Sequence, residues 1–140
     1  MRWKKHNSQK LAWVNINPYK INWQKSSRSK EQTALKEFLH QFWALKLVLE
    51  EFTLPGTLLK VDFLCVNSMI AIEHQGKGAH NEYNPFFHKG SRLNYLSSIK
   101  RDIKKAEILE QNGYKLVETQ TEDLPLLSRE FFREKFGVEL

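Results

Sequence analysis

The chain has 140 residues, of which 22 are Lys or Arg and 16 are Asp or Glu, so its formal net charge is +6, and 41% of its residues are hydrophobic. This length and composition fit one globular domain with its own core, and no apolar run approaches the roughly 18 residues that a membrane span needs. The single cysteine excludes an internal disulfide and a thiolate-only metal site, and the basic N-terminus lacks the apolar stretch of a signal peptide, so a cytoplasmic protein without a membrane partner is expected, in a bacterium or a phage-infected host cell.

Residues 1–28 are predicted to form a basic aromatic arm, and residues 29–140 a core domain. The first 30 residues carry eight Lys or Arg and no Asp or Glu, and aromatic residues are interleaved with these cations. Cations for phosphates and aromatic faces for bases are the composition of a nucleic-acid-binding arm. A solvated, partly disordered leader whose tryptophans pack on the core fits the composition equally well. On the first interpretation, the arm residues that contact DNA are Arg2, Lys4, Lys5, Trp13, Lys20, Trp23, Lys25 and Arg28.

The elements after the arm begin with a helix that Ser29 can cap and that ends near residue 44. Strand-like runs follow at 46–52, 58–66 and 69–75. Because Pro55-Gly56 and Asn67-Ser68 separate these runs, we expect three strands joined by turns.

A long polar connection, 76–94, opens the second half of the core. A helix is expected from about residue 95 to residue 111, where Asn112-Gly113 stops it in a left-handed cap. A fourth strand at 114–119 and a short helix at 128–136 complete the order α-β-β-β-α-β plus a closing helix. This order predicts an α/β fold with a mixed sheet of about four strands flanked by helices.

The turn at Asn67-Ser68 determines how the second and third strands of the core pair. A two-residue hairpin turn pairs Val66 with Met69, and the same register places Asp62 opposite Glu73. Directly opposed side chains share a sheet face with their Cβ atoms roughly 5 Å apart, and like charges there are destabilising. Since much of both hairpin faces is apolar, the two carboxylates converge in a mostly covered place, where a positive partner is expected.

Two helices are expected to carry further acids toward this pair. Glu31 continues the buried stripe of the first helix, and Asp102 lies next to the stripe of the second, with Lys105 on the near rim. Mg²⁺ or Mn²⁺ is held by carboxylate oxygens and water, so clustered acids beside a basic arm favour such an ion. Singly, each acid has a simpler explanation: an edge pair in solvent for Asp62 and Glu73, a helix-dipole acid for Glu31, an ion pair for Asp102. Their coincidence favours a metal site.

Asp62 on one predicted strand is followed by Glu73-His74-Gln75 on the next, between a helix with a glutamate and a later helix and strand. This arrangement resembles the PD-(D/E)XK nuclease superfamily, which has the restriction endonuclease-like fold, over residues 29–119. It is also similar to the branch containing the very-short-patch repair endonucleases and the EDxHD homing endonucleases. That similarity is carried by Glu73-x-Gln75-Gly76, His80, Arg101-Asp102-x-x-Lys105 and Leu109-x-x-x-Gly113-Tyr114-x-Leu116-Val117.

The resemblance implies that Asp62 and Glu73 ligate a metal ion together with the backbone carbonyl of His74. Glu31 would be the helix acid that binds a metal or its water. The same likeness implies that His80 acts as a base or a water-positioning group.

Asp102 would share that role with His80. Gln75 stands where most of the superfamily has lysine, and glutamine cannot supply positive charge to a forming hydroxide, although it can orient a water. Lys105 or His80 would then compensate for the missing lysine, and a weakened or inactive site is the alternative. His80 could accept a proton because imidazole titrates near neutrality.

Phosphodiester cleavage needs an activated water and a neutralised transition state, and one or two divalent ions supply both. The sequence therefore predicts a Mg²⁺-dependent endodeoxyribonuclease, with Mn²⁺ as a substitute, that acts on double-stranded or branched DNA; structure specificity and a phage or mobile-element association fit its size and family. A homodimer would supply two active centres. The alternatives are a non-catalytic DNA-binding protein on a degenerate nuclease scaffold and an RNA-directed nuclease. Core cations expected at phosphates are Lys77, Lys89, Arg92 and Arg101, and for the first three a solvated loop without ligand is the alternative.

Overall fold

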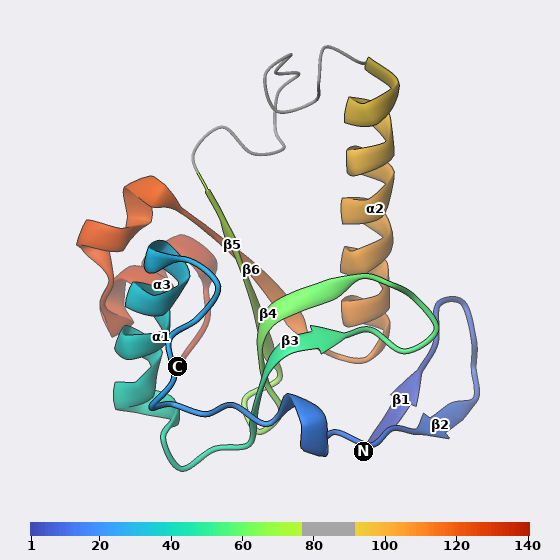
Figure 1. The fold of residues 1–140 in the computed structure, drawn as a ribbon, viewed down its shortest axis with the longest axis horizontal. Helices are drawn as coiled ribbons and strands as arrows, with labels where there is room; N and C mark the ends of the chain where they lie inside the picture. The colour runs from blue at the N-terminus through green and yellow to red at the C-terminus, as the bar shows by residue number, and fades with distance from the viewer. Residues whose placement is uncertain (77–91) are drawn as a thin grey trace.

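A four-stranded mixed sheet forms the centre of the part of the chain described by a computed structural model, residues 1–76 and 92–140 (Figure 1). Its strands, in spatial order, are β3 (Val48–Thr53), β4 (Lys60–Cys65), β5 (Ile70–Gln75) and β6 (Lys115–Gln120). The first three form an antiparallel meander, and β6 runs parallel to β5 after a crossover that contains α2 (Arg92–Gln111). The predicted α/β fold with a four-stranded mixed sheet flanked by helices is confirmed.

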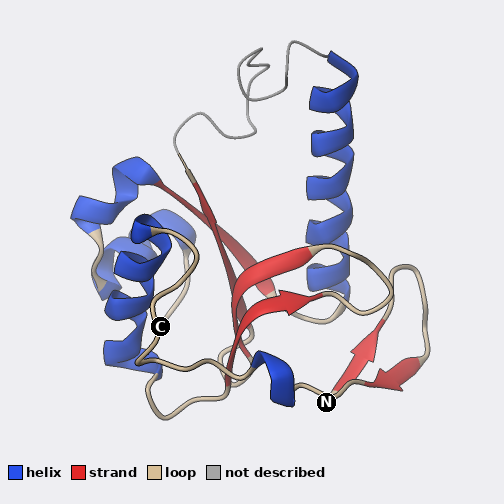
Figure 2. Cartoon of the chain, in the orientation of Figure 1, coloured by secondary structure: helices blue, strands red, loops and turns tan. Residues whose placement is uncertain are grey.

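Helices cover both faces of this sheet. Figure 2 shows α1 (Lys30–Trp43) and α3 (Arg129–Phe136) on one side and α2 on the other. Two separate apolar clusters follow from this three-layer arrangement. The α1 face buries Leu35, Leu39, Trp43, Phe63, Cys65, Ile70, Ile72 and Phe132, with others. The α2 face buries Trp3, Leu49, Phe52, Leu64, Ala71, Ile108 and Leu109, with others.

The helix ends that the sequence predicts at Ser29, Gly113 and Ser128 are found in the structure. The Ser29 side chain accepts a hydrogen bond from the Gln32 backbone N–H and caps α1, as predicted. Gly113 ends α2 with a φ of 86°, a left-handed conformation that glycine adopts without steric cost. Ser128 caps α3, and a short 3₁₀ segment, η2 (Thr121–Leu126), joins β6 to that helix.

The predicted register of the β4–β5 hairpin is confirmed, but the turn spans four residues, 66–69, and Val66 does not pair with Met69 as predicted. Phe63 pairs with Ile72, Leu64 with Ala71, and Cys65 with Ile70. Continuing this register along the two strands brings position 62 opposite position 73. Side chains two residues apart on a strand point to the same face of the sheet. Leu64 and Ala71 belong to the cluster on the α2 face, so Asp62 and Glu73 lie on that face too.

Residues 1–28 pack onto the core. A two-stranded hairpin, β1 (Arg2–Lys4) and β2 (Leu11–Trp13), places Trp3 in the α2-face cluster with 1% of its surface exposed. After the 3₁₀ turn η1 (Asn17–Tyr19), the backbone N–H of Ile21 donates to the Val48 carbonyl at 3.0 Å, and Lys20 bridges to Leu49. The segment predicted as an arm is thus joined to the outer edge of the sheet and to its core.

None of the helices in the described ranges combines the length and the apolar character that crossing a membrane requires.

Candidate active site

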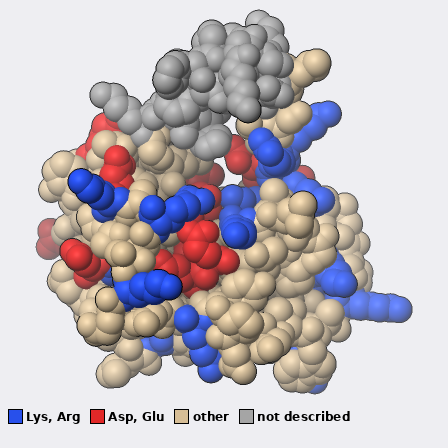
Figure 3. All heavy atoms as spheres, viewed as in Figure 1, with Lys and Arg blue, Asp and Glu red and all other residues tan. Residues whose placement is uncertain are grey.

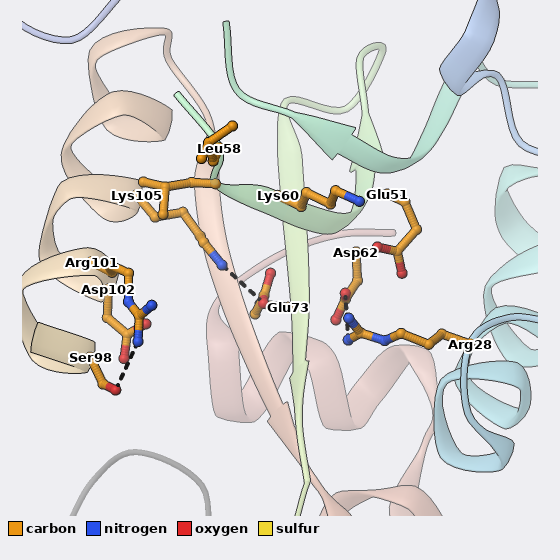
Figure 4. A pocket seen from close by; sticks show the side chains of 11 residues that line it. Arg28, Glu51, Leu58, Lys60, Asp62, Glu73, Ser98, Arg101, Asp102 and Lys105 are labelled. Carbon is orange, nitrogen blue, oxygen red and sulfur yellow. Dashed lines mark hydrogen bonds and ion pairs between the residues drawn. The ribbon is translucent and has the colours of Figure 1, made fainter. Parts of the chain in front are cut away.

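Asp62 and Glu73 line one pocket of about 290 Å³ at the α2 face of the sheet (Figure 4). Asp62 is 3% exposed, and the Glu73 side chain is 20% exposed. The His74 backbone N–H donates to Asp62 Oδ2 at 2.7 Å, so the β5 backbone itself holds the Asp62 carboxylate in place. The hairpin register therefore brings the two predicted acids together, as the sequence analysis requires.

Two cations from distant parts of the chain pair with these acids. Lys105 Nζ on α2 donates to Glu73 Oε1 at 3.1 Å, and Arg28 Nη2 lies 3.7 Å from Asp62 Oδ1. Lys60 and Arg101 also line the pocket. The positive partner expected beside the two carboxylates is thus present as side chains, with Lys105 in the place predicted for it.

Burial, and after it the negative charge of Asp62, raise the pKa of Glu73 to about 7, although Lys105 opposes the shift. Burial also raises the pKa of Asp62, against the hydrogen bond from the His74 N–H. The two carboxyl groups share one environment, so protonation of one favours ionisation of the other. A site with such groups is poised to exchange protons for a cation near neutral pH.

A hard divalent ion needs oxygen ligands, and the pocket offers those of its carboxylates. Glu73 Oε2 is buried and has no hydrogen-bond partner among the described residues. No group of three or more His, Cys, Asp or Glu side chains in the described ranges is arranged to hold a metal ion. Mg²⁺, however, commonly takes one or two carboxylates and completes its shell with water and phosphate oxygens. Asp62 and Glu73 fit that smaller donor set.

Glu51 is a third pocket carboxylate, and the sequence analysis missed it. It lies within β3 with a φ of 52°, a left-handed conformation that is strained for a residue with a β-carbon. Its Oε1 accepts from Gln32 Nε2 at 3.0 Å, and its negative charge contributes to the raised pKa of Asp62. The only sequence signal was the adjacent pair Glu50-Glu51 inside an otherwise apolar strand.

Glu31 does not join Asp62 and Glu73. Its Oε1 instead accepts from Thr121 Oγ1 and is 2.8 Å from His74 Nε2, and the other ring nitrogen of His74 is 2.8 Å from Thr119 Oγ1. Because successive strand residues point to opposite faces, His74 and Glu31 lie on the α1 face while Glu73 lies on the α2 face. The hydrogen bond to His74 lowers the pKa of Glu31. The expectation that both helices bring acids to one place is corrected for α1.

Asp102 lines the same pocket as Glu73, as predicted, together with Arg101 and Ser98 of α2. Gln75 is buried, and its Nε2 donates to Glu118 Oε2 at 3.1 Å, so its amide group is directed to β6 and it is not among the pocket residues. The predicted site residue His80 lies outside the described residues.

No protein-family model, no curated protein and no solved structure matches the chain. The site is therefore interpreted from its own geometry.

A second groove continues from the pocket toward the N-terminal segment. It shares Arg28, Glu51 and Lys60 with the pocket and adds Lys20 and Lys25. Figure 3 shows basic and acidic side chains gathered at the centre of this face of the molecule. Three of the predicted phosphate contacts, Lys20, Lys25 and Arg28, are thus placed in continuity with the acids. Of the other predicted contacts, Lys77, Lys89 and the Arg92 side chain lie outside the described parts of the chain.

The tryptophans predicted to contact DNA differ in their surroundings. Trp23 stacks on His40 with 4.9 Å between ring centroids and packs against the α1-face cluster. Trp13 is 76% exposed at the end of β2. Each ring has a neighbour over it, His40 for Trp23 and the Arg2 guanidinium for Trp13, but Trp23 also packs on the core whereas most of Trp13 is left exposed for stacking.

Proposed function

We propose that the protein is a metal-dependent DNA endonuclease that hydrolyses phosphodiester bonds on a restriction endonuclease-like core. The observation that carries the proposal is the convergence of Asp62 and Glu73 in one pocket with Lys105 and Arg28. The order α1-β3-β4-β5-α2-β6, with β6 parallel to β5, agrees with the core expected from the resemblance. A groove lined by Lys20 and Lys25 leads to the pocket and suits a phosphate backbone.

Asp62 and Glu73 are the residues that would hold Mg²⁺ or Mn²⁺. When bound, such an ion supplies a more acidic water and positive charge for the pentacoordinate phosphate. The His74 N–H keeps Asp62 oriented, and Lys105 favours the ionised form of Glu73. Arg28, Lys60 and Arg101 provide positive charge where the scissile phosphate would enter.

Two further roles in the proposed chemistry belong to His80, which lies outside the described residues, and to Gln75. His80 is assigned the proton from the attacking water, which an imidazole can take near neutrality. Gln75 could orient that water only by turning from Glu118, since its amide now donates there. Asp102 lines the pocket and is the better-placed group for positioning water.

The test uses supercoiled and branched DNA with Mg²⁺ or Mn²⁺. Asp62→Asn and Glu73→Gln keep the shape of each side chain and remove its charge, so each should lower cleavage roughly a hundredfold or more. Glu107→Gln is the matched control, because Glu107 is an exposed α2 carboxylate that pairs with His6 away from the pocket. Metal binding is measured separately, as an increase in unfolding temperature with Mg²⁺ that Asp62→Asn abolishes.

Cleavage that is equal in all four proteins, or absent with every metal, would contradict the enzyme proposal. A non-catalytic DNA-binding protein is the second candidate, because Lys105 and Arg28 already pair with the two acids and Gln75 stands in the usual lysine position. DNA binding that survives both substitutions without any cleavage would support that candidate. Faster cleavage of RNA than of DNA would support the RNA-directed nuclease.

A further inference from the structure

The outer face of the β1–β2 hairpin combines cations with exposed apolar side chains. Arg2 pairs with Trp13 and Lys4 with Leu11 across the hairpin, and directly opposed residues share a face. Trp13 is 76% exposed and Leu11 is 54% exposed. The outer face is thus formed by Arg2, Lys4, Leu11 and Trp13, and we call it the hairpin platform.

The platform is held rigidly. Trp3 on the inner face of the hairpin is buried against Phe52 and Tyr114. The Lys4 backbone N–H donates to Asn112 Oδ1 at 2.8 Å, and Asn112 Nδ2 donates back to the Lys4 carbonyl at 2.9 Å. The exposure of Trp13 is therefore a property of a fixed surface, not of a loose chain end.

Trp13 differs from the other tryptophans in its surroundings. Trp3 and Trp43 are buried, and Trp23 is stacked on His40. The Arg2 guanidinium lies 5.1 Å from the Trp13 ring centroid, which orients the ring through a cation–π contact. A large aromatic ring held in solvent gains little for folding, and here it shares one face with a second exposed apolar side chain, Leu11, and two cations.

We propose that the hairpin platform is a stacking site for an unpaired base of a nucleic acid. An unpaired base offers its flat face to an aromatic ring, whereas a paired base keeps its faces stacked within the duplex. Arg2 and Lys4 beside the ring suit the flanking phosphates, and the first 30 residues carry no acid that would repel them.

The hairpin that carries the platform contacts the loop between β3 and β4, which also contributes to the pocket. Lys5 lies against Gly56, since a β-carbon at Gly56 would be 3.3 Å from Lys5 Cδ. The same β3–β4 loop continues to Leu58 and Leu59, which line the pocket. This inference rests on the proposed function in one respect, namely that the partner is a nucleic acid.

A lipid surface is the competing partner for a cationic and aromatic surface. The platform carries only two exposed apolar side chains, Leu11 and Trp13, on strands of three residues each. Stable membrane attachment needs a larger apolar face than this, so the platform favours a nucleic acid.

The test measures tryptophan fluorescence and binding without divalent metal, so that cleavage plays no part. Trp13 is the most exposed of the four tryptophans, and stacking of a base on its ring should quench the emission. Oligothymidylate should quench wild type, and a blunt hairpin duplex should quench it less. Trp13→Ala should remove the quenching and weaken oligothymidylate binding roughly tenfold, because one stacked base is lost.

Trp13→Phe keeps a stacking ring and should retain most of the affinity. Leu126→Ala, which shortens an exposed apolar side chain on η2, is the matched control and should bind like wild type. Far-ultraviolet circular dichroism checks that each variant folds. The proposal is overturned if Trp13→Ala binds like wild type, if the duplex quenches as strongly as the single strand, or if only phosphatidylserine vesicles change the emission. Because metal is absent, loss of the nuclease proposal alone would leave the expected quenching intact.

Discussion

The pocket raises the pKa of the Glu73 carboxyl group to about 7, from an ordinary value of 4.5. Between pH 4.5 and about 7, the folded state therefore keeps a proton on Glu73 that the unfolded state has released. Stability falls as pH rises through this window and stays low above it. The side chain is 20% exposed, so solvent screens part of the effect.

We predict that Glu73→Gln stabilises the fold at pH 8 and has little effect at pH 4. The difference between the two pKa values corresponds to an upper bound of roughly 3 kcal/mol in the free energy of unfolding. Urea unfolding at both pH values measures it. Glu139→Gln is the control, since the pKa of Glu139 is lowered by Arg133 and its loss should not stabilise the protein at pH 8. Equal pH profiles for wild type and Glu73→Gln would show that Glu73 titrates normally.

At the scale of single residues, the sequence predicts correctly that Asp62 and Glu73 come together, but it wrongly places Glu31 of α1 beside them. Asp62 and Glu73 followed from the turn at Asn67-Ser68, because register depends on local pairing. Glu31 could not be placed in the same way, because helical periodicity shows which side of α1 is buried but not which face of the sheet that side covers. Glu51 was missed because its conformation is set by contacts with the rest of the fold, not by strand alternation.

At the scale of elements, the strand β3 contains a change of face. Leu49 and Phe52 both belong to the α2-face cluster, although residues three apart in a regular strand point to opposite faces. The left-handed conformation of Glu51 between them accounts for the change, and it directs the Glu51 side chain to the pocket.

We predict that Glu51→Gly raises the free energy of unfolding, or leaves it unchanged. Glycine adopts the left-handed conformation without strain, which is worth about 1 kcal/mol, and this offsets the lost contact with Gln32. Thr53→Gly on the same strand is the matched control and should destabilise by about 1 kcal/mol, because its backbone gains nothing from glycine. Chemical denaturation gives both values. A larger loss for Glu51→Gly than for Thr53→Gly would show that the Glu51 backbone is unstrained.

The order of elements was predictable because each has its own signal. Ser29 and Asn112-Gly113 mark helix ends, and the apolar runs between Pro55-Gly56 and Asn67-Ser68 mark strands. The β1–β2 hairpin was not predicted, since strands of three residues show too little alternation and its cations resemble those of a solvated arm.

At the scale of the whole molecule, the N-terminal segment is both structural and cationic. Trp3 belongs to the core and Ile21 bonds to β3, so removal of residues 1–28 would expose the α2-face cluster. Charge substitutions at exposed positions therefore test the role of this segment in DNA binding better than deletion does.

We predict that Lys20→Gln with Lys25→Gln reduces the salt dependence of DNA affinity. Each lost phosphate contact lowers the slope of log affinity against log salt by about 0.9, so the double variant should be shallower by up to about 2. Fluorescence anisotropy with a labelled duplex over a salt series measures the slope. Lys104→Gln with Lys115→Gln removes the same charge from exposed positions outside the groove and should leave the slope near that of wild type. Identical slopes for the two double variants would mean that Lys20 and Lys25 do not contact the phosphates of DNA.

The two central acids come from one hairpin, but their compensating cations come from opposite sides of it in the sequence, Arg28 ahead of the sheet and Lys105 within the crossover helix α2. A partly folded chain that had formed only the meander would hold two neighbouring carboxylates with neither cation in place. The repulsion between them would be relieved only as α2 and the N-terminal segment dock. The two acids can therefore be ionised together only in the complete fold, once both cations are in place.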